Sequence, residues 1–315
     1  MKRLICAALL VSLAIHAHAQ DSEKPAERGA AIRTRAQADA ARLLPQRGLG
    51  SSETNDIKPN GTKFSECKIE LEGCEKMKGF VSVPEDLEAG KNYALMFVFH
   101  GNGDRGEGRT RVLSRVTTKR DPVFVVGVQY QELTEDGKGK MGLPTLAKPE
   151  KIIEGCKWLL EKTIKDQPID TSRVFVGGFS WGTAWTTSWC NKEWRDDADK
   201  FPFRTAFLYS SGGQGTKETI PPIPIISTVG ENELESKGSF EVLPAVRHFS
   251  NVISAWGVPS QHHEIPGMGH DVNYRCLQIT RDVINELGGP GALPYSAASK
   301  AAPEPLPLKQ AKTPT

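Results

Sequence analysis

The chain has 315 residues, 38% hydrophobic and 25% charged, a composition ordinary for a globular protein with one large domain or two small ones. Its 40 Lys and Arg against 38 Asp and Glu give a formal charge of +2, and losing Lys2 and Arg3 with an N-terminal leader would bring this to 0. Such a chain has no electrostatic bias toward nucleic acid or anionic membranes, so we expect no nucleic-acid partner.

The N-terminus has the pattern of a secretory signal peptide, which we assign to residues 1–20. Lys2 and Arg3 precede an apolar run over residues 4–15, and Ala17-His18-Ala19 offers small residues for cleavage. The run is shorter than the roughly 20 apolar residues of a membrane-spanning helix. The sequence therefore predicts a secreted or periplasmic protein without a membrane span.

The segments flanking the predicted domain have little apolar surface to bury. Residues 21–60 predict a flexible leader with helical composition over 30–44, and the Pro/Ala/Lys-rich residues 289–315 predict a disordered tail. Residues 61–288 remain as the folded domain.

Five cysteines lie beyond the leader, and export would permit disulfides between them. An odd number leaves at least one thiol over or paired between chains. We predict a disulfide between the neighbouring Cys67 and Cys74, across a β-turn, and leave the pairing of Cys156, Cys190 and Cys276 open.

Strand and helix patterns alternate along the domain. Two short strands, 64–71 and 77–83, joined through Glu72-Gly73-Cys74, predict an antiparallel N-terminal hairpin. Apolar runs predict further strands at 93–99, 123–128, 174–179, 206–209, 223–229 and 262–265. Helices are predicted at 105–120, 152–164, 181–194, 240–256 and 272–287. This alternation predicts an α/β fold with a mostly parallel, doubly wound sheet and helices on both faces.

The stretch Gly178-Phe179-Ser180-Trp181-Gly182 joins a buried strand to a helix. A serine at such a sharp turn sits in strained backbone, and glycines two residues away on each side leave room for it. The following helix directs its first N–H groups to the same point, where negative charge on a substrate oxygen would develop. We interpret Ser180 as a nucleophile. The tryptophans at four-residue spacing in this helix are interpreted as core packing rather than as a binding platform.

Other strand ends carry residues that could complete a site with Ser180, because the carboxyl ends of parallel strands share one edge of a sheet. A serine needs a base, and His270 follows the last strand in a glycine-rich loop. The rival histidines lie within a predicted strand or helix: His248, His262 and His263.

The acid that would orient the base is less well defined by the sequence. Glu233, three residues past Gly230 at a strand end, is our candidate, and Glu231 and Asp271 are its rivals. The order serine, acid, histidine is that of the α/β-hydrolase triad.

An oxyanion hole would take one N–H from Trp181 and one from Asn102, in the loop after His100-Gly101. The sequence contains no Gly-Lys-Ser/Thr phosphate loop, no dinucleotide fingerprint and no metal-ligand spacing, so we expect neither cofactor nor metal.

Together the His-Gly loop, Gly-Phe-Ser-Trp-Gly, Gly-Glu-Asn-Glu and Gly-Met-Gly-His resemble the α/β-hydrolase superfamily over residues 78–287, nearest its secreted polyhydroxybutyrate depolymerase and feruloyl or acetyl esterase branch. The chain departs from that branch in having glutamate where aspartate is usual. It departs from prolyl-oligopeptidase-like peptidases at Thr183, where they commonly have glycine.

The resemblance implies a secreted serine esterase that cleaves a carboxylic ester, polymeric or small, through an acyl-enzyme. A peptidase on the same fold and a non-catalytic exported binding domain are the alternatives.

Overall fold

The structure is a computed structural model that describes residues 61–234 and 242–287. The predicted signal peptide, leader and tail lie outside these residues. Among the described helices, none is both long enough and apolar enough to cross a membrane.

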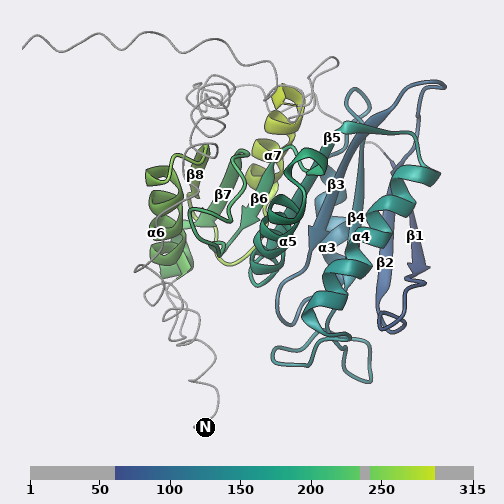
Figure 1. The fold of residues 1–315 in the computed structure, drawn as a ribbon, viewed down its shortest axis with the longest axis horizontal. Helices are drawn as coiled ribbons and strands as arrows, with labels where there is room; N and C mark the ends of the chain where they lie inside the picture. Colours follow the sequence, from purple (N-terminus) through teal and green to yellow (C-terminus); the bar gives the residue numbers. More distant parts are fainter. Residues whose placement is uncertain (1–60, 235–241, 288–315) are drawn as a thin grey trace, which may run out of the picture.

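In this described part of the chain, eight strands form a single sheet in the order β1-β2-β4-β3-β5-β6-β7-β8 (Figure 1). Strands β1 and β2 form the predicted antiparallel hairpin, β2 pairs antiparallel with β4, and the strands from β3 to β8 run parallel. The strands are β1 (Thr62–Lys68), β2 (Lys78–Pro84), β3 (Tyr93–Phe99), β4 (Val123–Gln129), β5 (Ile169–Phe179), β6 (Ala206–Tyr209), β7 (Ile225–Gly230) and β8 (Ser260–Ile265). The predicted fold class is therefore confirmed.

Within residues 61–234 and 242–287, five α-helices pack on the two faces of this sheet. They are α3 (Gly106–Leu113), α4 (Pro149–Asp166), α5 (Gly182–Asp196), α6 (Val242–Ala255) and α7 (Tyr274–Leu287). Figure 1 shows α4 and α5 in front of the sheet and α3 and α7 behind it.

Side-chain alternation along β3 builds both cores. Leu95 and Phe97 belong to the cluster that contains α4 and α5 residues, whereas Ala94 and Met96 belong to the cluster that contains α3 and α7 residues. Because successive strand side chains point to opposite faces, an uninterrupted apolar run buries both sides of a central strand.

Several predicted boundaries differ from the structure by a few residues, and two differences are larger. The helix expected over 105–120 ends at Leu113 and continues as a short 3₁₀ turn, Ser114–Val116, in which Ser114 Oγ donates to Arg111 O at 2.8 Å. Strand β5 begins at Ile169, earlier than the predicted 174, although its apolar run begins only at Val174.

The predicted disulfide is not formed, since Cys67 and Cys74 are both free thiols. Cys67 lies on β1 opposite Gly79, while Cys74 lies beyond the strand and its Sγ donates to Lys151 O on α4 at 3.1 Å. The spacing of the two residues is short, but the sulfur of Cys74 is directed toward a helix rather than across the hairpin.

Candidate active site

Ser180 sits in a strained turn between β5 and α5. Its φ is +53°, in the left-handed region, and its amide donates to Tyr209 O at 2.8 Å. A Cβ on Gly178 would lie 2.2 Å from Gly182 O, and one on Gly182 would lie 2.6 Å from Phe99 O. The close approach of helix and strand therefore requires glycine at both positions.

A chain of hydrogen bonds links Ser180 to two residues far away in the sequence. His270 Nε2 lies 2.9 Å from Ser180 Oγ, and His270 Nδ1 lies 2.6 Å from Glu233 Oε2. The side chain of Glu233 is 1% exposed and that of His270 is 43% exposed. A buried carboxylate thus contacts one ring nitrogen, and the other nitrogen contacts the serine hydroxyl where solvent reaches it.

Backbone contacts fix the loop of Glu233 against the loop of His270. Gly230 N donates to Glu233 Oε1 at 2.9 Å. Asn232 donates through its backbone to Met268 O at 3.0 Å and through its side chain to Gly267 O at 3.1 Å. Each oxygen of the Glu233 carboxylate therefore has a separate partner, which sets the direction of the side chain.

The rival acids do not reach the His270 ring. Glu231 is exposed, two positions before the buried Glu233. Asp271 is also exposed, and its Oδ1 accepts from its neighbour Val272 N at 2.7 Å. Of the three acids weighed from the sequence, the structure brings only Glu233 to His270.

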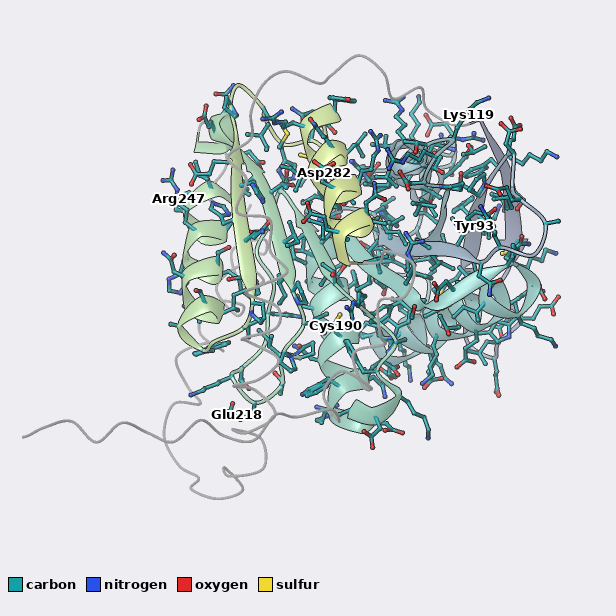
Figure 2. The ribbon with its side chains drawn as sticks, turned by 90° about the horizontal axis from the view of Figure 1, so that it is seen from above. Tyr93, Lys119, Cys190, Glu218, Arg247 and Asp282 are labelled. Carbon is teal, nitrogen blue, oxygen red and sulfur yellow. The ribbon has the colours of Figure 1, made fainter. Side chains whose placement is uncertain are left out.

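The rival histidines lie elsewhere in the fold. His262 contacts Ser227 Oγ at 3.1 Å and Glu264 Oε1 at 3.2 Å, and Glu264 also pairs with Arg247 on α6. Figure 2 labels Arg247 at one side of the molecule. His263 contacts Gln261 at 3.1 Å, and burial lowers the pKa of His263.

His248, the remaining rival, is an exposed residue of α6. The structure therefore brings none of these three histidines into the hydrogen-bonded chain of Ser180 and Glu233.

The loop after β3 abuts the serine. A Cβ placed on Gly101 would lie 3.1 Å from Ser180 Cβ. Within the described residues, the amides of Asn102 and Trp181 donate no backbone hydrogen bond to another residue. The two amides therefore belong to the two segments that meet at Ser180.

Gln131, which follows β4, fixes this loop and was not singled out from the sequence. Its Nε2 donates to Asn102 Oδ1 and to Leu143 O, both at 2.8 Å, and its Oε1 accepts from Gly103 N at 3.0 Å. Gln131 is 1% exposed. A buried glutamine whose amide is fully bonded holds the position of Asn102.

His100 is buried at the start of the same loop. Its ring stacks on Tyr130 with centroids 4.1 Å apart, and Nδ1 lies 2.7 Å from Gly101 O. Burial lowers the pKa of His100 to about 4, so the ring is neutral near pH 7 and its Nδ1–H donates to that carbonyl.

Two further residues beside the site were not singled out from the sequence, one at the end of a strand and one on a helix. Ser210, at the end of β6, has φ +55°, and its Oγ donates to Asp271 O at 3.1 Å, next to His270. Arg109 on α3 lies over the ring of Phe179, with Cζ 3.7 Å from the centroid. Nothing in the sequence signals either contact, because both depend on the placement of segments distant in the chain.

The tryptophans of α5 differ in environment. Trp189 is fully buried against Phe97 and Phe203, as core packing predicts. Trp181 is 40% exposed beside Ser180, and the centroid of its ring lies 6.1 Å from that of Trp185. The interpretation as core packing is therefore correct for Trp189 and wrong for Trp181.

No protein-family model matches the chain, and no curated protein matches it by sequence. Solved structures share its fold. An esterase from Rhizomucor miehei matches with a TM-score of 0.55 and 14% identity, covering 91% of this chain and 97% of that one. The esterase Est22 matches with a TM-score of 0.52 and 13% identity, covering 93% of this chain and 97% of that one. A ferulic acid esterase matches with a TM-score of 0.51 and 15% identity, covering 72% of this chain and 99% of that one.

The similarity lies in the fold rather than in the sequence. At 13–14% identity, these esterase structures still cover more than 90% of this chain with TM-scores of 0.52 and 0.55. The chain therefore has the α/β-hydrolase fold.

Proposed function

We propose that the protein is a serine hydrolase that cleaves carboxylic esters through an acyl-enzyme. The observation that carries this proposal is the chain of hydrogen bonds from Glu233 through His270 to Ser180, whose serine sits in strained backbone. The likeness in fold to structures of esterases supports it. An unstrained, unpartnered serine would be a weak nucleophile.

In the proposed reaction Ser180 Oγ attacks the carbonyl carbon of the ester while its proton moves to His270 Nε2. Glu233 stabilises the imidazolium through Nδ1, and the amides of Asn102 and Trp181 bind the negatively charged oxygen. The tetrahedral intermediate then collapses, and His270 returns the proton to the departing alcohol. Water, deprotonated by His270, cleaves the acyl-serine and restores the free enzyme.

We further propose that the protein acts after export, in the periplasm or outside the cell. The signal-peptide pattern of residues 1–20 supports this. Mass spectrometry of the protein purified from a secreting host should find a mature N-terminus close to residue 20. An unprocessed Met1 on protein retained in the cytoplasm would contradict the proposal.

The nucleophile is tested by labelling with a fluorophosphonate, which reacts with activated serines. Wild-type protein should label and should hydrolyse p-nitrophenyl acetate, and Ser180→Ala should do neither. Ser188→Ala, on the same helix α5, is a matched control that should label like wild type. A wild-type protein that neither labels nor hydrolyses the ester would favour the non-catalytic alternative, and equal labelling of Ser180→Ala would move the nucleophile elsewhere.

The choice of substrate distinguishes a peptidase from an esterase. Matched ester and anilide substrates with the same acyl group should show turnover of the ester far above that of the anilide. Comparable turnover of both would favour the peptidase. A polyester film and a soluble ester, compared in the same assay, decide whether the substrate is polymeric.

A further inference from the structure

Arg109 on α3 is a buried cation that the reaction scheme above does not use. Its side chain is 9% exposed, and both Nε and Nη2 lie 2.8 Å from Asp104 Oδ2. Its Cζ lies 3.7 Å from the ring centroid of Phe179. Its Nη1 lies 3.7 Å from Asp271 Oδ1, which is a weak ion pair rather than a hydrogen bond.

The three partners of Arg109 belong to three of the four segments that carry the proposed site; the fourth is the loop of Glu233. Asp104 follows Asn102 in the loop after β3. Phe179 immediately precedes Ser180, and its ring lies 5.0 Å from that of His270. Asp271 immediately follows His270. One guanidinium therefore touches the oxyanion loop, the serine turn and the histidine loop.

Stability alone does not account for this arrangement. A buried guanidinium is costly unless all its donors are bonded. Within the described residues, Arg109 Nη1 is buried and has no hydrogen-bond partner. The chain thus keeps an incompletely satisfied cation where an apolar side chain would avoid that cost, which points to a role in the site.

We propose that Arg109 is a positioning residue for the proposed ester hydrolysis, and this inference rests on the function proposed above. The planar guanidinium stacks on Phe179 and fixes that ring, which in turn packs against the imidazole of His270. Its attraction for Asp271 draws the residue after His270 toward α3. Both contacts hold His270 Nε2 in line with Ser180 Oγ.

The expected effect of losing Arg109 follows from geometry. A displacement of a reacting group by about 1 Å can lower a rate by about 100-fold, because the hydrogen bond that transfers the proton is no longer aligned. Substrate binding does not require that alignment, so the loss should fall on kcat and leave KM nearly unchanged.

Arg111, two residues further along α3, offers a matched control. It also pairs with a carboxylate, Glu107 Oε1 at 3.0 Å, and its Cζ also lies over an aromatic ring, 3.8 Å from the centroid of Phe64. The side chain of Arg111 is 56% exposed. The segments that hold its two partners contain none of the proposed site residues. Arg111→Met therefore removes the same two kinds of contact without disturbing the site.

The experiment measures kcat and KM for p-nitrophenyl acetate, with thermal unfolding, in full-length wild type, Arg109→Met, Arg109→Lys and Arg111→Met. We expect Arg109→Met to lower kcat about 30-fold and to change KM less than about threefold. Arg109→Lys keeps the charge and should recover part of kcat, while Arg111→Met should stay within about twofold of wild type. Equal kcat for folded Arg109→Met and Arg111→Met would overturn the proposal.

If Arg109→Met does not fold, Arg109→Lys is compared with Arg111→Lys. An ammonium can bind Asp104 but cannot also stack flat on Phe179, so kcat should fall about fivefold only at position 109. Equal kcat in this pair overturns the positioning role. Failure of the proposed function is distinguishable, since wild type itself would then hydrolyse no ester.

Discussion

The imidazole Nδ1 of His270 lies 2.6 Å from Glu233 Oε2, although 37 residues separate them. The other carboxylate oxygen of Glu233 accepts the Gly230 amide at 2.9 Å, so the carboxylate is held at both oxygens. This arrangement selects between two glutamates that are two positions apart and that the sequence pattern alone left in competition.

Substitution of the two glutamates should therefore have very different effects. Glu233→Gln replaces a carboxylate by a neutral amide that stabilises the imidazolium poorly, and we expect kcat/KM for p-nitrophenyl acetate to fall about 1,000-fold. Glu231→Gln, on an exposed side chain, should stay within about twofold. A larger loss from Glu231→Gln than from Glu233→Gln would place the acid at 231.

Glutamate should not be replaceable by aspartate at position 233. The side chain of Glu233 places its carboxylate oxygens against both His270 and Gly230. An aspartate is one methylene shorter, so its oxygens would lie about 1.5 Å further back. We expect Glu233→Asp to lower kcat about 100-fold with little change in KM. Wild-type kcat in Glu233→Asp would show that the loop adjusts to the shorter side chain.

Gln131 should matter for catalysis although it does not contact Ser180. In Gln131→Glu the carboxylate cannot donate to Asn102 Oδ1 or Leu143 O, so the Asn102 amide should lose its fixed position. Losing one oxyanion donor costs about 100-fold in kcat or more, and we expect a loss of about 10- to 100-fold here. The same change at Gln261, on β8, is the control and should leave kcat near wild type. Wild-type kcat in Gln131→Glu would contradict the role of Gln131.

The two kinds of glycine near the site should respond oppositely to alanine. A Cβ on Gly178 would lie 2.2 Å from Gly182 O, so Gly178→Ala should lower the free energy of unfolding by about 3 kcal/mol or more. Gly108 lies within α3, where a Cβ would meet only Arg105 Cβ at 3.8 Å. Gly108→Ala should raise the free energy of unfolding by about 0.5 to 1 kcal/mol. Urea unfolding of both variants measures these effects, and equal midpoints would refute the steric argument.

Stability should depend on pH through His100. Burial lowers its pKa in the folded chain to about 4, whereas the unfolded chain has an ordinary histidine pKa of about 6.5. Between these values the unfolded chain binds a proton that the folded chain does not, so the free energy of unfolding falls as the pH drops from about 6.5 to about 4. The full loss is on the order of 3 kcal/mol, and above pH 6.5 this contribution is constant.

Urea unfolding of wild type and His100→Gln across this pH range measures the effect of His100. Glutamine does not titrate, so the variant should show a shallower slope between pH 6.5 and 4. Identical slopes for the two proteins would exclude His100 as a source of the pH dependence.

Local patterns in the sequence were sufficient for the strands, the hairpin and the fold class. The uninterrupted apolar run of β3 and the glycines around Ser180 have direct physical causes, burial on both faces and close backbone approach. Each is a property of neighbouring residues, so it can be recognised without the tertiary structure. The same patterns placed His270 after the last strand, at the sheet edge that also carries Ser180.

Only the tertiary structure decided which side chains meet. Glu233 and Glu231 share a short loop, and the direction of their side chains depends on the Gly230 amide and on the neighbouring loop of His270. The contacts of Gln131 and Arg109 join segments distant in sequence, and the sulfur of Cys74 is directed to α4. Sequence spacing constrains neighbours along the chain, whereas these contacts depend on how β-strands, helices and loops pack in space.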